Sequence, residues 1–462
     1  MRFRSKKDHV LASIIQVLLM LVAPVAQGQP AVALDVKETP AFPVSPSNVN
    51  SFATPLAYYQ GSIYVVSVEP PLSNNNGVNL RTVIRKGSER QGRWQWESAV
   101  IDEATLDDMY HTQASIAIDK EGYLHVVYNM HNMPWQYVVS KKPGDITSFE
   151  FKGDKISLAE KSTVKHLNKT PFPSIGTAAI PGNQITYPAF FYDRQGEIYL
   201  TYRFATKPKK AFGNRGFAFA LARYDVPTKR WVSLGGSIKV TAGEAALPKG
   251  LSETEVKAFI CSEGWQPQLL RLFFDRKNRM HISWSWREFY GDSPFVRPSY
   301  AYSRDNENLF YRADGNKHTL PVRLQDSGLL FPDRPESRLS SPMAYVTADP
   351  EGTPYVVTSE KGKASEVRYY RWDANEWSSG EPTPAGAQIF EIDDVGKQWA
   401  FATGLKVYSR NESNMNWIKA YEDTGSSRFG FLKILHLQKH GQFLVYAQSV
   451  DGKSAKVYDI RY

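Results

Sequence analysis

The stretch HTQASIAIDKEGYLHVVYNMHNMPWQY, residues 111–137, predicts a β-hairpin. Its turn is Asp119-Lys120-Glu121-Gly122, in which glycine adopts backbone angles that other residues resist. The runs on either side, 115–119 and 123–129, are rich in β-branched and aromatic residues, which favour strands. The sequence therefore predicts short antiparallel strands joined by a tight turn.

Two histidines lie at the open end of this hairpin. His111 and His131 are equally far along the chain from Glu121, so closing the hairpin at its turn brings the two imidazoles together. A second hairpin, TYPAFFYDRQGEIYLTYRF, is flanked in the same way by Tyr187 and Arg203. All four side chains are expected at the end of their hairpins that lies away from the turns.

The hairpin pattern recurs along the chain. Each unit begins with an apolar strand, a D-x-x-G-like turn and a second apolar strand; a strand with Tyr-Ser or Tyr-Arg, a polar turn and often a Trp follow. Repeated four-stranded units of about 40 to 50 residues predict an all-β fold, a seven-bladed β-propeller. Two β-sandwich domains are the alternative, but no linker divides the chain. The first halves are LAYYQGSIYVVSV, IAIDKEGYLHVVY, FFYDRQGEIYLTY, LFFDRKNRMHISW, VTADPEGTPYVVT and LHLQKHGQFLVYA, with AQIFEIDDVGKQWAFA opening an extra unit.

The N-terminus has the pattern of a secretory signal peptide over residues 1–28. A basic start precedes the apolar run 10–25, and Ala26-Gln27-Gly28 fits a small-x-small cleavage site. We therefore expect a secreted or periplasmic protein without a membrane anchor once the signal is cleaved; an uncleaved anchor is the alternative. Residues 29–52 are expected to form an extended lead-in, and 53–462 a single propeller domain.

Composition limits the partners. The formal net charge of +9 is compatible with an anionic polysaccharide. Nucleic acid is a poor candidate for an exported chain without a basic helix or a reader motif. Cys261 is the single cysteine, which excludes an intrachain disulfide, and the protein is expected to be a monomer. Helical patterns are scarce, with one short helix expected over residues 252–259.

The repeat separates structural from functional residues. His125, Tyr199, His281 and Tyr355 all lie six residues after the Asp of their turn. A ring that recurs in register is interpreted as a packing residue. By contrast, His111, His131, Tyr187 and Arg203 break the pattern at strand ends, where sites are commonly placed on a scaffold.

Other side chains could contribute to substrate binding. A basic loop follows Arg203 and contains Lys207, Lys210 and Arg215; a solvated surface loop is the alternative. Trp286 and Arg287 could supply a stacking wall and another cation, or could belong to ordinary blade packing. A zinc site needs three or four ligands at set spacings, and no such set is found, so any metal site stays unknown.

The segment H-x-x-x-S-I-A-I-D-x-x-G-Y-L-H-V-x-Y-x-M-H-N, residues 111–132, and the hairpin 187–203 resemble the BNR-repeat-like polysaccharide lyases. These are the seven-bladed propeller ulvan lyases of lyase families 24 and 25. The resemblance implies an active site of His111, His131, Tyr187 and Arg203 and, often, a structural metal ion. It also implies ulvan, or another uronate-bearing polysaccharide, as the substrate.

Uronate β-elimination suits these residue types. Arg203 would pair with the carboxylate and stabilise the enolate-like charge. Neutral His111 would remove the C5 proton and Tyr187 would protonate the C4 leaving oxygen, or Tyr187 would do both. His131 would orient the substrate or hold the tautomer of His111. No cofactor is required for this chemistry. A propeller glycoside hydrolase, which needs paired carboxylates or an Arg triad with a Tyr-Glu pair, and a non-catalytic carbohydrate-binding propeller are the alternatives.

Overall fold

A computed structural model of the protein describes residues 33–48, 52–71, 79–106, 111, 113–133, 135–153, 185–206, 216–242, 252–288, 293–305, 308–361, 367–411, 416–425 and 428–462. The chain divides into a leading unit, Met1–Ala33, and a unit from Leu34 to Tyr462. The predicted signal peptide, residues 1–28, lies outside the described residues. All of the sheets belong to the second unit.

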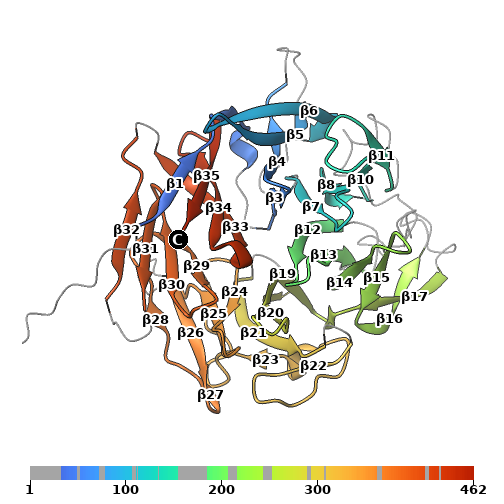
Figure 1. Ribbon diagram of the computed structural model, residues 1–462. Coiled ribbons are helices and arrows are strands. Elements are labelled where there is room, and N and C mark those ends of the chain that lie inside the picture. Colours follow the sequence, from blue (N-terminus) through green and yellow to red (C-terminus); the bar gives the residue numbers. More distant parts are fainter. Residues whose placement is uncertain are drawn as a thin grey trace, which may run out of the picture. The chain divides into compact units, whose positions relative to one another are not determined.

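Seven antiparallel sheets of four or more strands stand around a common centre, so the predicted all-β, seven-bladed propeller is confirmed (Figure 1). In each blade the first strand along the chain lies nearest the centre. The strands of blades 1 to 4, from inner to outer, are β3 (Leu56–Tyr59), β4 (Ser62–Glu69), β5 (Asn79–Arg90) and β6 (Arg93–Leu106); β7 (Ser115–Ile118), β8 (Leu124–Val127), β10 (Tyr137–Ser140) and β11 (Phe149–Phe151); β12 (Ile185–Tyr192), β13 (Ile198–Ala205), β14 (Phe217–Asp225) and β15 (Arg230–Leu234); β19 (Trp265–Phe274), β20 (Met280–Glu288), β21 (Phe295–Ser303) and β22 (Phe310–Tyr311).

Blades 5 to 7 complete the ring, and the extra unit predicted before the last repeat forms blade 6. Their strands are β24 (Tyr345–Ala348), β25 (Pro354–Thr358), β26 (Arg368–Asp373) and β27 (Glu376–Trp377); β29 (Ala387–Ile392), β30 (Gln398–Ala402), β31 (Lys406–Arg410) and β32 (Ile418–Glu422); β33 (Phe429–Leu437), β34 (Gln442–Ser449), β35 (Ser454–Arg461) and, outermost, β1 (Asp35–Glu38). Short additions are β2 (Phe42–Pro43), β9 (His131–Met133), β18 (Ile260–Cys261), β23 (Gly328–Leu329), β28 (Glu381–Pro382) and the single-turn 3-10 helices η1 (Pro46–Asn48), η4 (Leu324–Asp326) and η5 (Gln438–His440).

The two ends of this unit close the ring. Strand β1 pairs antiparallel with β35, so the start of the domain supplies the outer strand of the last blade (Figure 1). This pairing gives β35 a partner on its outer side, where an unpaired strand edge would present free backbone groups. Within the predicted lead-in, β1 and β2 both pair with β35, so these residues belong to the same compact unit as the blades, which begins at Leu34.

The repeated turns are built around one carboxylate. In the first hairpin, Asp119 Oδ1 accepts the backbone N–H groups of Glu121 and Tyr123, at 3.0 and 2.9 Å. Gly122 has a φ of 90°, a left-handed conformation that suits glycine. Asn278 occupies the glycine place in blade 4 with a φ of 61°, as its position in the repeat predicted. The same pair of hydrogen bonds recurs at Asp193, Asp275 and Asp393, and Asp349 Oδ1 accepts the second bond of the pair, from the Thr353 N–H.

The two in-register histidines are structural. His125 is buried, with Nδ1 lying 2.6 Å from the Tyr137 hydroxyl and Nε2 lying 3.3 Å from Asp119 Oδ2. His281 repeats this arrangement in blade 4, and in blade 6 the ring at the same place is Trp399, whose Nε1 donates to its turn carboxylate at 2.9 Å. The ring at this place therefore joins the turn to the blade interior.

The prediction of a short helix over residues 252–259 is wrong. Residues 252–258 form strand β17, which pairs antiparallel with β16 (Gly236–Ala242) along its whole length. Glu255 and Lys257 are exposed, whereas Val256 and Ala258 are buried in the core of blade 3. The alternation has the period of a strand, and pairing with β16 outweighs the helical propensity of the glutamates.

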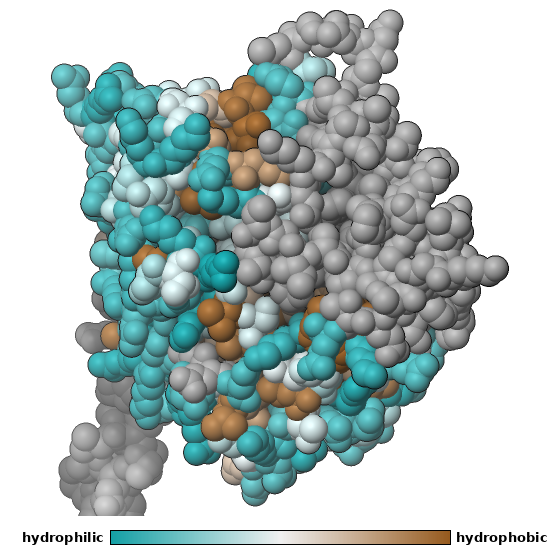
Figure 2. Space-filling model, turned by 90° about the vertical axis from the view of Figure 1, so that its right-hand side faces the viewer, coloured by the Kyte–Doolittle hydropathy of each residue, from teal (hydrophilic) through white to brown (hydrophobic). Residues whose placement is uncertain are grey.

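The side of the domain that carries β11, β15, β16 and β17 is mostly hydrophilic where described residues are visible, with separate hydrophobic patches (Figure 2). The apolar side chains lie mainly between adjacent blades. Within the described ranges no helix is long and apolar enough to cross a membrane.

Candidate active site

The site lies at the end of the hairpins away from their turns. Strand β9 leaves blade 2 and pairs with β12, the inner strand of blade 3. In this register His131 lies opposite Thr186, directly beside Tyr187 in the chain. Thr186 also lies opposite Arg203 on β13. Thr186 therefore pairs with His131 on one neighbouring strand and with Arg203 on the other, and both lie close to Tyr187.

Tyr187 sits in a β-bulge. The register of β12 and β13 shifts between Thr186 and Ala189, and Tyr187 has a φ of 61°. Such a backbone is strained for an aromatic residue, and bulges commonly redirect a side chain. Leu269 occupies the same place before the turn of blade 4 and also has a positive φ, 47°. The bulge thus recurs in the repeat, while the phenol is specific to blade 3.

The rings of the site are stacked. The imidazoles of His111 and His131 have centroids 3.9 Å apart and planes inclined by 9°. The ring of His111 also stacks on Tyr187, with centroids 5.8 Å apart. The guanidinium carbon of Arg203 lies 4.5 Å from the centre of the Tyr187 ring and 4.4 Å from that of Phe217. The four predicted catalytic side chains are therefore neighbours.

Arg203 is a buried cation at this site. It is only 6% exposed, and its Nη1 donates to Gln266 Oε1 at 3.3 Å. Its Nε has no hydrogen-bond partner among the described residues. Burial lowers the pKa of Arg203; Tyr187 opposes this effect, and the nearby positive charge of Arg287 adds to it. A buried guanidinium with an unused donor is suited to an anionic ligand.

These side chains line a cavity of about 410 Å³. No carboxylate is found among the described residues that line it, whereas two arginines are. Arg287 stacks on Phe295, with its guanidinium carbon 5.4 Å from the ring centre. The cavity is therefore cationic and aromatic. Its lining consists of Phe52, His111, His131, Tyr187, Arg203, Gln266, Gln268, Leu269, Arg287, Phe295 and Pro342.

The predicted substrate-binding residues have different outcomes. Arg287 lines the cavity. Trp286 does not form the stacking wall that was expected. It is fully buried in the blade core, and its Nε1 donates to Ser299 Oγ at 3.1 Å, so its ring is not accessible to a substrate. Its neighbour points the other way because side chains alternate along a strand. The basic-loop residues Lys207, Lys210 and Arg215 lie outside the described residues.

Sequence reasoning missed six lining residues, which are Phe52, Gln266, Gln268, Leu269, Phe295 and Pro342. Gln266 and Gln268 lie on β19, the inner strand of blade 4, at nearly the same distance from the turn as His111 in blade 2, and the W-Q-P-Q stretch was a usable signal. No sequence pattern identified Phe52, because only the tertiary structure brings it to the cavity. It packs against the Tyr187 ring with centroids 5.1 Å apart.

The metal implied by the resemblance is assigned no ligands. In the part of the chain that the structure describes, no group of three or more His, Cys, Asp or Glu side chains is arranged to hold a metal ion. Cys261, the single cysteine of the sequence, is half-buried.

A ring of seven repeat-built blades with a site at one end defines a β-propeller of the BNR type. Residues 57–383 match the family described as BNR repeat-containing family member, and the chain belongs to this family. No curated protein matches the sequence.

Solved structures with this fold include two polysaccharide lyases. The polysaccharide lyase Uly1 is 12% identical, with a TM-score of 0.58 over 93% of this chain and 100% of that chain. An ulvan lyase of family PL25, bound to -[GlcA(1-4)Rha3S]-, is 14% identical, with a TM-score of 0.57 over 91% of this chain and 95% of that chain. At these identities the likeness concerns the fold.

Proposed function

We propose that this protein is a polysaccharide lyase that cleaves a uronate-containing polysaccharide, with ulvan as the first candidate, by β-elimination. The observation that carries the proposal is the meeting of His111, His131, Tyr187 and Arg203 in one cationic cavity. The fold shared with ulvan lyases supports the choice of substrate. The predicted signal peptide is consistent with action outside the cytoplasm on a polymer too large to enter it.

The carboxylate of the substrate would bind Arg203. Abstraction of the C5 proton moves negative charge onto the carboxylate oxygens, so a fixed cation stabilises the transition state more than the ground state. Arg203 is held between two aromatic faces and by Gln266, which fixes the guanidinium before the substrate arrives. Arg287 would add to the positive potential of the cavity.

His111 and Tyr187 would carry the proton transfers. Their rings lie against each other, so both can reach one sugar ring. In one assignment His111 takes the C5 proton and Tyr187 protonates the C4 oxygen as the C4–O bond breaks. In the other, Tyr187 does both and His111 positions it. His131, stacked on His111, would hold the orientation of that imidazole.

The test is formation of the unsaturated product. The purified protein is incubated with ulvan and with a panel of other uronate polymers, and the ultraviolet absorbance of the conjugated alkene is followed. Tyr187→Phe should lower the rate by about 10²- to 10⁴-fold, and Arg203→Ala by about 10²- to 10³-fold. The controls Tyr302→Phe and Arg304→Ala alter the same residue types away from the cavity and should leave the rate unchanged.

The outcomes separate the alternatives. A rise in absorbance only with another polymer would keep the mechanism and replace the substrate. Hydrolysis without absorbance would identify a glycoside hydrolase, and binding without cleavage a carbohydrate-binding propeller. A His111→Gln variant tests the assignment: a lowered rate with loss of the acid-side limb of the pH–rate profile would identify His111 as the titrating base, whereas a lowered rate with an unchanged profile would make it a positioning residue.

A further inference from the structure

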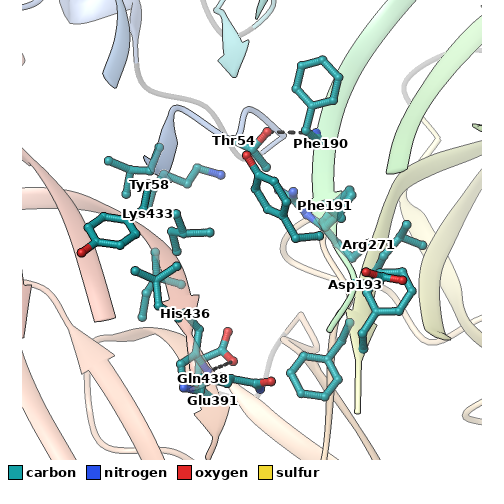
Figure 3. A pocket seen from close by; sticks show the side chains of 18 of the residues that line it. Thr54, Tyr58, Phe190, Phe191, Asp193, Arg271, Glu391, Lys433, His436 and Gln438 are labelled. Atoms are coloured by element: carbon teal, nitrogen blue, oxygen red, sulfur yellow. Dashed lines mark hydrogen bonds and ion pairs between the residues drawn. The ribbon is translucent and has the colours of Figure 1, made fainter. Parts of the chain in front are cut away.

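A second cavity, of about 450 Å³, occupies the central channel on the turn side of the ring (Figure 3). It is lined by inner strands of blades 1, 3, 4, 5, 6 and 7 and by two of their turns. None of the four proposed catalytic side chains lines it. Two buried cations do: Arg271 on β19 and Lys433 on β33.

Arg271 has donors without acceptors. The residue is 5% exposed, and its Nη1 donates to the backbone oxygen of Phe52 at 3.1 Å. Among the described residues, Nε and Nη2 have no hydrogen-bond partner, and no carboxylate forms an ion pair with the guanidinium. The rings of Tyr345 and Phe191 lie at 5.3 and 6.0 Å from the guanidinium carbon. Aromatic faces do not accept hydrogen bonds from N–H groups that lie in the guanidinium plane. The two buried donors therefore stay unsatisfied, which costs free energy until an acceptor binds.

Lys433 faces the same space from the other side. It is 7% exposed, and in Figure 3 it and Arg271 extend into the pocket from opposite walls. Burial, and next the charge of Arg271, lower the pKa of Lys433 well below its usual range. The carboxylates of the channel are engaged elsewhere. Glu391 Oε2 lies 3.2 Å from His436 Nδ1, and Asp193 accepts two amides of its own turn and the Asn278 side chain.

We propose that the channel binds a small inorganic oxyanion, such as sulfate, between Arg271 and Lys433. Nε and Nη2 share one edge of the planar guanidinium, and this edge can donate to two oxygens of one anion. Lys433 would supply a second charge from the opposite wall. One anion would thereby accept from both unpartnered donors of Arg271, and its negative charge would favour the protonated form of Lys433.

The site also bears on the catalytic cavity. Arg271 holds the carbonyl of Phe52, and the Phe52 ring packs on Tyr187. Thr54, two residues after Phe52, is hydrogen-bonded to blades 2 and 3. Its backbone N–H donates to Ser115 Oγ, and its Oγ1 accepts from the backbone N–H of Phe190. An anion that fixes Arg271 therefore supports the segment that separates the two cavities. Sulfate binding at Arg271 requires no lyase activity.

Binding is measured by equilibrium dialysis of the full chain against radiolabelled sulfate. The wild type should show one saturable site. Arg271→Met and Lys433→Met should each weaken it by roughly ten- to hundredfold, the effect of losing hydrogen bonds to a charged group. Arg304→Met removes an exposed arginine outside the channel and should leave binding unchanged. Absence of saturable binding to the wild type, or unchanged binding in both channel variants, would overturn the proposal.

Thermal unfolding excludes misfolding as the cause. Methionine relieves the burial of an unpaired charge, so Arg271→Met should melt at or above the wild-type temperature in sulfate-free buffer. Added sulfate should raise the wild-type midpoint more than that of Arg271→Met, because binding stabilises the folded state, whereas exclusion of sulfate from surfaces acts on both. Equal rises in the two proteins would contradict a site at Arg271.

Discussion

Removal of one oxygen tests the structural role of the in-register histidines. In blade 4, the His281 Nδ1 lies 2.7 Å from the Tyr300 hydroxyl and its Nε2 lies 3.3 Å from Asp275 Oδ2. Burial lowers the pKa of His281, which favours the neutral ring. The carboxylate accepts from Nε2–H, so Nδ1 accepts from the Tyr300 O–H.

Tyr300→Phe leaves that nitrogen without a donor. Both residues are 1% exposed, and the space of one oxygen is too small to admit a water molecule. An unsatisfied buried polar group costs about 1–3 kcal/mol, so the free energy of unfolding should fall by that amount. Tyr137→Phe removes the matching hydroxyl, 2.6 Å from His125 Nδ1 in blade 2, and should cost a similar amount. The two losses should add, because the networks share no residue.

Urea unfolding followed by tryptophan fluorescence measures the change. Tyr302→Phe is the matched control, since its hydroxyl accepts only from the exposed Arg304 Nη2, at 3.2 Å, among the hydrogen bonds described. The control should lie within about 0.5 kcal/mol of the wild type. If Tyr300→Phe and Tyr302→Phe unfold alike, the buried network does not hold the blade as argued. Any lyase activity should survive both, because the network lies on the turn side.

Two further predictions concern stability. His318 is 3% exposed, and burial, then Arg312, lower its pKa to about 4. In the unfolded chain this imidazole is protonated near pH 6.5, so the free energy of unfolding should fall by about 3 kcal/mol as the pH drops from about 6.5 to about 4. His318→Gln should flatten this part of the pH–stability curve. An unchanged curve would refute the role of His318. Gly235 has a φ of 127°, and an added Cβ would lie 2.2 Å from the Ala258 oxygen. Gly235→Ala should therefore cost about 3 kcal/mol or more in urea unfolding, whereas Gly264→Ala, with open space around it, should cost only about 1–2 kcal/mol; equal losses would contradict the clash.

The sequence by itself determined the repeat and the difference between its structural and its exceptional residues. Turn carboxylates, turn glycines and period-two apolar runs are local features, so the blades could be counted from them. The same register identified His125 and His281 as packing residues, which their burial and hydrogen bonds confirm. The hairpin also predicted that His111 lies beside His131, and the two imidazoles do stack, although the strand that carries His131 pairs with β12 of blade 3.

Only the tertiary structure decided what depends on pairing between segments distant in the chain. Strand β1 joins the last blade, and β17 is a strand because β16 lies beside it. Trp286 and Arg287 look equivalent in sequence, but one side of β20 faces the core and the other the cavity. Arg271 and Lys433 lie in apolar strands of different blades. Their meeting across the channel follows from closure of the ring, which no local pattern encodes.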